Sequence, residues 1–104
     1  MKLISKPEEL ILLAVLRLKD QAYCVPIRDQ IISITGKDWS FGSIYIPLNR
    51  LESKGLIESF LGPPSNERGG RPKRYYRLTD RGRAELRVAR GIEKKMWKGI
   101  PENI

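Results

Sequence analysis

An unbroken apolar run near the start of the chain places the strongest constraint on its fold. Residues 10–16 have the sequence LILLAVL and follow Glu8 and Glu9. In a helix these seven side chains point in every direction, and a helix that is apolar on all sides must be covered from more than one side. A chain of 104 residues can build only a modest core of its own. The run therefore predicts a helix that is covered in part by a second subunit.

The expected limits of this first helix are residues 5–19. Ser5 and Glu8 have the spacing of a capping box, and Pro7 suits a first helical turn, where its missing N–H has no partner to lose. Seven apolar residues are too few to cross a bilayer, and the acidic residues before them are unlike a signal peptide. The sequence therefore predicts a cytoplasmic protein that does not bind a membrane.

The residue types that many enzymes and metal sites use are scarce. The chain has no histidine, and Cys24 is its only cysteine, which excludes a disulfide within the chain and the usual sets of zinc ligands. A glycine-rich phosphate motif is also missing. We therefore expect no cofactor, no metal site and no enzymatic activity. Cys24 is interpreted as a small core residue, and the alternative is a reactive thiol.

Two shorter helices are expected next. The first covers residues 26–36, where three isoleucines have helical spacing and Gly36 suits a left-handed end. The second covers residues 40–55, with Ser40 as the N-cap, and Pro47 inside it deletes one backbone hydrogen bond and can kink the helix. The predicted core stripes are Ile27, Ile31 and Ile34 in the first helix, and Ile44, Leu48 and Leu51 in the second.

The remainder of the chain predicts a hairpin and a last helix. Residues 56–61 and 73–78 are expected as strands around an exposed loop, residues 62–72, which is rich in Gly and Pro. Thr79 can cap a helix over residues 80–98. Helix, helix, helix, hairpin and helix is the order of a winged helix-turn-helix. We therefore expect a mostly α fold with a β-hairpin, in which residues 1–79 form the winged helix-turn-helix and residues 80–104 add a C-terminal dimerisation helix to the same compact domain.

The positive charge of the chain is concentrated in its second half. The net charge is +8, and residues 68–83 hold seven cations and one anion, Asp80. A localised basic surface favours a polyanionic partner, nucleic acid before an anionic membrane. The alternative is a basic face that only aids solubility.

Two sequence blocks resemble one family of regulators. Residues 40–45 (SFGSIY), Leu48, and residues 50–52 (RLE) and 54–58 (KGLIE) are similar to the recognition helix of PadR-like transcriptional regulators. Residues 69–79 (GGRPKRYYRLT) are similar to their wing, and Gly82 follows where their last helix begins. The resemblance covers roughly residues 5–90. It implies a homodimeric repressor of transcription that often responds to a small molecule. In such proteins a proline often follows the tyrosine directly, whereas here Ile46 intervenes before Pro47.

The outward face of the predicted recognition helix supplies candidate contacts to double-stranded DNA. With Ile44 turned to the core, steps of 100° per residue turn Ile46 and Asn49 outward. Asn49 can pair with adenine, and Ile46 can contact a thymine methyl group. Hydroxyl groups near the helix start can bind phosphate, and a glycine permits close approach. The alternative is an ordinary polar surface. The predicted DNA-binding residues here are Ser40, Gly42, Ser43, Tyr45, Ile46, Asn49 and Arg50.

The predicted wing adds a second group of DNA contacts. In the returning strand, Tyr76 and Leu78 are expected to face the core, and Tyr75 and Arg77 the other side. Basic residues at or near the tip suit contacts to phosphate or to the minor groove, and the alternative is a solvated run of charge. The predicted wing contacts are Arg68, Arg71, Lys73 and Arg74.

The first and last helices are the predicted dimer interface. Its expected residues are Leu12, Leu16, Leu86, Ala89, Ile92, Met96 and Trp97. Trp97 either packs against the partner or forms a flat platform for a small hydrophobic or aromatic effector between subunits. The alternative to sequence-specific regulation is a winged-helix module that contacts protein or RNA and binds DNA without regard to sequence.

Overall fold

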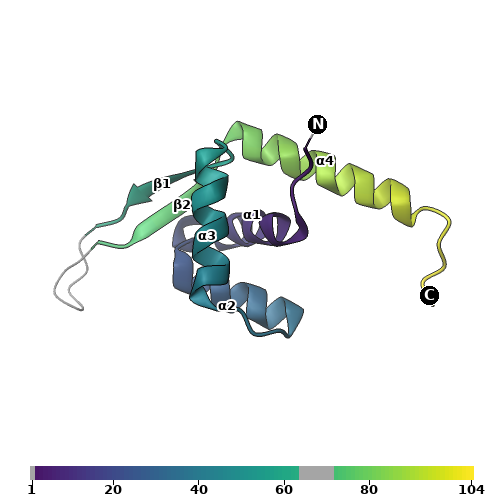
Figure 1. The fold of residues 1–104 in the computed structure, drawn as a ribbon, viewed down its shortest axis with the longest axis horizontal. Coiled ribbons are helices and arrows are strands. Elements are labelled where there is room, and N and C mark those ends of the chain that lie inside the picture. The colour runs from purple at the N-terminus through teal and green to yellow at the C-terminus, as the bar shows by residue number, and fades with distance from the viewer. Residues whose placement is uncertain (1, 64–71) are drawn as a thin grey trace.

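The computed structural model describes residues 2–63 and 72–104 and contains four α-helices and one hairpin in these ranges. Helix α1 is Lys6–Leu18 and continues into the 3-10 turn Lys19–Gln21; α2 is Cys24–Thr35 and α3 is Phe41–Ser53. Strands β1, Ile57–Leu61, and β2, Arg74–Leu78, are followed by α4, Asp80–Trp97. The hairpin and α4 extend in opposite directions from the cluster of α1, α2 and α3 (Figure 1). The predicted winged helix-turn-helix fold is confirmed.

Helix α1 lies at the centre of the core. Ile11 and Leu12 are fully buried, and α1 contacts α2, α3, α4 and β2. The expected capping box is present, because the Ser5 hydroxyl accepts from the Glu8 amide and the Glu8 carboxylate accepts from the Ser5 amide. Leu12 was expected to contact a second subunit, and this was wrong for its side chain. A helix without a polar face gives no indication of which side its own chain covers.

Helices α2 and α3 contribute the rest of the helical core. In α2, Ile27 and Ile31 are buried, but Ile34 is 58 % exposed, so its expected place in the core stripe was wrong. Ile34 lies on the last turn of α2, which extends past the core, and Gly36 ends that helix with a positive φ of 69°. The predicted stripe of α3 is confirmed, since Ile44, Leu48 and Leu51 are all fully buried.

Proline does not break α3. The helix continues from Phe41 to Ser53 with Pro47 inside it, and the Ser40 side chain caps its start as predicted.

Helix α2 begins two residues before Pro26, at Cys24. Cys24 packs against the edge of the core, and burial raises the pKa of its thiol above the usual value. These properties favour the interpretation of Cys24 as a packing residue.

The hairpin is attached to the core by one face of each strand, through Ile57 of β1 and through Tyr76 and Leu78 of β2. Its antiparallel register pairs Ile57 with Leu78 and Leu61 with Arg74. Tyr76 and Leu78 are buried as predicted, and burial raises the pKa of Tyr76 to about 12. The Tyr76 amide donates to the Ala22 carbonyl oxygen at 2.9 Å, which ties the base of the wing to the segment between α1 and α2.

Helix α4 is attached to this unit mainly near its start, and farther along it the Glu93 carboxylate lies 3.7 Å from the Lys6 ammonium of α1. The Thr79 hydroxyl accepts from the Gly82 amide at 3.1 Å, and the Arg83 guanidinium donates to the Leu78 carbonyl oxygen. Gly82 is buried against Leu56, the residue before β1, where a Cβ atom would lie 2.0 Å from the Leu56 carbonyl oxygen. Beyond Leu86, no residue of α4 is buried.

Candidate nucleic-acid interface

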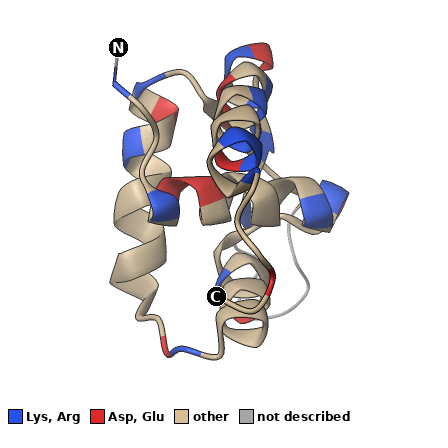
Figure 2. Ribbon diagram, turned by 90° about the vertical axis from the view of Figure 1, so that its right-hand side faces the viewer, with Lys and Arg blue, Asp and Glu red and all other residues tan. Residues whose placement is uncertain are grey.

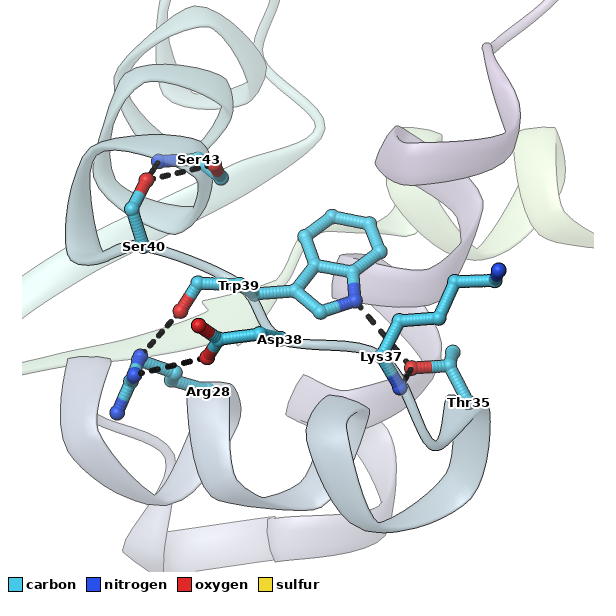
Figure 3. A network of polar contacts seen from close by, with 7 residues as sticks. All are labelled: Arg28, Thr35, Lys37, Asp38, Trp39, Ser40 and Ser43. Atoms are coloured by element: carbon cyan, nitrogen blue, oxygen red, sulfur yellow. Dashed lines mark hydrogen bonds and ion pairs between the residues drawn. The ribbon is translucent and has the colours of Figure 1, made fainter.

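The turn between α2 and α3 is held by a network of polar contacts (Figure 3). The Arg28 Nε donates to the Trp39 carbonyl oxygen at 2.5 Å. The Thr35 hydroxyl accepts from the Trp39 indole N–H and from the Lys37 amide, both at 3.2 Å, and donates to the Ile31 carbonyl oxygen at 2.8 Å. Because Trp39 also packs against the core, the backbone enters α3 in one direction.

The first turn of α3 is capped by its own side chains. The Ser40 hydroxyl accepts from the Ser43 amide at 3.1 Å and lies 2.7 Å from the Ser43 hydroxyl (Figure 3). Both serines were predicted to bind phosphate. The structure brings them together as a capping pair, which leaves them exposed at the positive end of the helix dipole. Their contact with phosphate stays a prediction.

The outer face of α3 is exposed as helical geometry predicted. Tyr45 and Ile46 are 49 % and 60 % exposed, and Gly42, Asn49 and Arg50 also lie in solvent. The opposite face holds the three fully buried residues of the stripe. The orientation of the candidate base-contacting residues is therefore confirmed, whereas their contact with DNA stays a prediction.

The described part of the wing presents two of the four predicted cations. Arg68 and Arg71 lie outside the described residues. Arg74 donates to the Ser59 hydroxyl at 2.8 Å, and that hydroxyl donates to the Glu52 carboxylate at 2.6 Å. Glu52 belongs to α3, so this chain of hydrogen bonds joins β2 to the predicted recognition helix through β1.

The base of the wing also carries an aromatic cluster, defined here as Tyr23, Phe60 and Tyr75. The ring centroids of Tyr23 and Tyr75 are 5.3 Å apart, and those of Phe60 and Tyr75 are 5.9 Å apart. The Lys73 ammonium lies 4.6 Å from the centre of the Tyr23 ring. The Lys73 ammonium is thus held against the cluster by its charge, although the residue remains exposed.

Two residues that are not among the predicted DNA contacts lie at the leading end of α3. Phe41 is the first helical residue and is 50 % exposed, and the Arg28 guanidinium carbon lies 4.5 Å from the centre of its ring. Steps of 100° place Phe41 only 60° from the direction of Ile44, which predicts burial. The first turn extends past the core, so the ring is exposed. The feature of the sequence that could have identified Phe41 is an aromatic residue directly after the N-cap Ser40.

The other end of α3 is fixed by a nearly buried ion pair. The Lys54 ammonium lies 2.8 Å from the Glu8 carboxylate, whose side chain is 5 % exposed. Burial disfavours the charged form of Glu8, but hydrogen bonds from Lys54 and Ser5 outweigh it and lower the pKa of the carboxyl group. The pair joins the end of α3 to the start of α1.

Helices α1 and α4 leave a long apolar surface open. We call it the α1–α4 groove; it encloses about 650 Å³. Arg83, Arg87, Arg90 and Lys94 stand along it, together with Glu9 and Glu93. Figure 2 shows that basic and acidic positions recur along α4. The apolar lining residues are Leu13, Leu16, Leu86 and Trp97.

Three residues of the predicted dimer interface, Leu16, Leu86 and Trp97, line this groove, whereas Ala89 and Ile92 line a second pocket between α4 and the N-terminal segment. Leu16, Ile92 and Trp97 are between 40 % and 49 % exposed, and Met96 is 71 % exposed. Ala89 is partly covered, and Leu86 is already buried within the chain. The structure also adds Leu13, which is 41 % exposed on α1 and was not selected from the sequence.

Two further properties limit the kinds of site that this chain offers. Within residues 2–63 and 72–104, no three His, Cys, Asp or Glu side chains gather where a metal ion could be held. None of the helices described combines the length and the apolar character that crossing a membrane requires.

Comparison with known proteins places this arrangement in a family. The family model of the transcriptional regulator PadR-like family matches residues 12–88. A PadR family transcription regulator from Clostridium difficile is 29 % identical, with a TM-score of 0.67 over 92 % of this chain and 91 % of that one. One from Eggerthella lenta is 27 % identical, with a TM-score of 0.67 over 88 % and 77 % of the two chains.

A more distant structure agrees in fold. A transcriptional regulator from Clostridium thermocellum is 24 % identical, with a TM-score of 0.70 over 89 % of this chain and 87 % of that one. No curated protein matches the sequence significantly. Because the family model spans most of the chain, including α3, the strands of the wing and the start of α4, the chain belongs to the PadR-like family of transcriptional regulators, which are DNA-binding proteins.

Proposed function

We propose that this chain is a cytoplasmic homodimeric repressor that reads a near-palindromic DNA site with helix α3 and holds the DNA backbone with its wing. One observation carries the proposal. Helix α3 buries one complete face and presents the other to solvent, with Asn49 and Ile46 outward beside Arg50 and Tyr45. Such a helix can enter the major groove while its own chain fixes its orientation.

A second subunit would complete the assembly. Helix α4, which carries the exposed Ile92, Met96 and Trp97, extends away from the hairpin (Figure 1), so a dimer formed on its far part leaves both recognition helices free. Two symmetric recognition helices favour a site with two matching halves about one helical turn apart. The finer division of the chain, with residues 1–79 as the DNA-binding part and 80–104 for dimerisation, belongs to this proposal.

A small planar apolar effector is the proposed signal. Trp97 is 49 % exposed and lines the α1–α4 groove, where a flat ligand could stack between subunits. The competing proposal for Trp97 is packing against the partner. Quenching of Trp97 fluorescence by ligand in a Trp39→Phe background supports the first, and loss of the dimer alone in Trp97→Ala supports the second.

Selection of genomic fragments, followed by titration at one fixed salt concentration, tests the main proposal. The wild-type chain should bind a selected duplex at least a thousandfold more tightly than random duplex, as specific DNA-binding proteins do. Asn49→Ala should lose about 1–3 kcal/mol on the selected duplex and nothing on random DNA. Ile46→Ala should lose less and weaken the preference for thymine.

The same titration also tests the proposed contacts of the wing with the DNA backbone. Replacing Lys73 and Arg74 with Ala should weaken binding to all duplexes alike, and each lost phosphate contact should reduce the salt slope by about 0.9. Equal, weak affinity of the wild-type chain for every duplex would instead support a module that contacts protein or RNA. Repression is then tested by transcription from a promoter that carries the selected site.

A further inference from the structure

The exposed aromatic ring at the leading end of α3 is not explained by packing. Phe41 is half exposed, although α3 has three fully buried residues that already fill its core face. Phe41 and Tyr45 are four residues apart, so they adjoin on one side of the helix. The ring stands in the first turn, the part of a recognition helix that usually reaches the bases.

Arg28 holds this ring from the neighbouring helix. Its guanidinium carbon lies 4.5 Å from the ring centre, within the range of a cation–π contact. The same group donates to the Trp39 carbonyl oxygen and lies 3.6 Å from the Asp38 carboxylate (Figure 3). Arg28 therefore contacts the backbone just before the N-cap and the side chain just after it.

The contacts of Arg28 differ in strength, and the stronger ones fix the position of the Phe41 ring. Its side chain is 25 % exposed, whereas that of Asp38 is 94 % exposed, so the ion pair is weak and the carbonyl and ring contacts define the geometry. A planar guanidinium that stacks on one face of a ring limits the rotation of that ring. Less side-chain freedom remains to be lost when the ring meets a ligand.

We propose that Phe41 reads a thymine methyl group in the major groove and that Arg28 is the positioning residue that holds it there. The proposal rests on the proposed function, in which α3 enters the major groove. The 5-methyl group of thymine is the apolar feature that this groove presents, and aromatic carbon is a suitable partner for it. Phe41 thereby adds one specified base pair to each half-site, on the side of α3 that faces α2.

Replacement of single thymines by deoxyuridine in the selected duplex tests the reading residue. The substitution removes one methyl group and leaves base pairing intact. One symmetric pair of positions should lose affinity about fourfold per methyl group with the wild-type chain, the value expected for one buried methyl. Phe41→Ala should remove that difference at this position and leave the other positions unchanged. A full wild-type difference in Phe41→Ala would overturn the proposal.

Arg28 is tested by a conservative variant and a double-mutant cycle. Arg28→Lys keeps the charge but loses the planar stack and the Nε hydrogen bond. It should reduce the deoxyuridine difference as Phe41→Ala does, and the double variant should show no further loss. Thr35→Val is the matched control, because it removes the hydrogen bonds of Trp39 and Lys37 from the same turn without touching Arg28 or Phe41.

The outcomes separate this proposal from the one on which it rests. If the wild-type chain prefers a sequence but Arg28→Lys loses affinity equally on selected and random duplexes, Arg28 acts on phosphate and its positioning role is wrong. If Thr35→Val abolishes the deoxyuridine difference as well, the effect is general loosening of the turn, which also overturns that role. If the wild-type chain prefers no sequence, the proposed function itself fails. Thermal unfolding by circular dichroism confirms that each variant is folded.

Discussion

Helices α3 and α4 both expose apolar side chains, but the chain holds them very differently. Helix α3 is fastened at its start by the turn that contains Trp39 and at its end by the Lys54–Glu8 pair. Helix α4 is buried within the chain only in its first turns, up to Leu86, and its far part is joined to α1 by the exposed ion pair Lys6–Glu93. The difference indicates that the direction of α3 is set within one chain, whereas the far part of α4 is exposed and available for the partner of the proposed dimer. The predictions that follow test this contrast.

The largest expected effect is on the association of α4 with a partner. Replacing Ile92 and Met96 with Glu should raise the dissociation constant of the dimer by on the order of a thousandfold, because burying even one unpaired carboxylate costs several kcal/mol. Both residues are exposed in the single chain, so folding should be little affected. Ile34→Glu, on an exposed site of α2, is the control. Sedimentation at micromolar concentration should show a monomer for the variant with Ile92 and Met96 replaced, and a dimer for Ile34→Glu. An unchanged dimer in the former would show that the far part of α4 does not bind a partner.

The fastened start of α4 should be intolerant of a single methyl group. In Gly82→Ala, the new Cβ would lie 2.0 Å from the Leu56 carbonyl oxygen, which is backbone and cannot turn aside. We expect a loss of about 3 kcal/mol in the free energy of unfolding, at the upper end for an overpacked site. Urea denaturation measures it. Stability close to the wild-type value would mean that the start of α4 does not pack against the Leu56 backbone as described.

The fastened end of α3 should show a dependence on pH. The folded chain lowers the pKa of Glu8, so its stabilising contribution is present above the usual carboxyl pKa of 4.5 and is lost as the pH falls below it. Glu8→Gln should cost about 2 kcal/mol at neutral pH, the scale of a hydrogen bond to a charged group. The difference between wild type and variant should shrink in acid. A difference that is constant with pH would show that the charge of Glu8 does not hold α3.

The smallest expected effect lies in the exposed far part of α4. A Cβ at Gly91 would meet no atom of the described chain within 4 Å. Gly91→Ala should therefore stabilise the helix by about 0.5–1 kcal/mol, because alanine loses less conformational freedom than glycine. The same substitution would then have opposite signs at two sites of one helix. A destabilised dimer in this variant would place the partner directly against Gly91.

Local patterns in the sequence were sufficient where a short spacing decides the structure. The capping box at Ser5, the N-cap at Ser40 and the buried stripe of α3 each depend on residues within one or two turns. Helical spacing was not sufficient where burial depended on the extent of the core. Ile34 was expected in the core stripe, and Phe41 lies only 60° from the direction of Ile44, yet both are exposed on turns that extend past the core. Contacts between distant segments, such as Arg28 with Trp39 or Glu8 with Lys54, have no local signature.

The Glu8–Lys54 pair also has a consequence for the order in which the chain folds. The two residues are separated by 46 positions. The ion pair can therefore form only after the chain up to the end of α3 has been synthesised and has folded back onto α1. Closing such a loop costs entropy that local helix formation does not. During synthesis, α1 can form its first turn early, because Ser5 lies close by. Its docking should be completed only when residue 54 has emerged, so the start of α1 and the end of α3 should become protected from hydrogen exchange together.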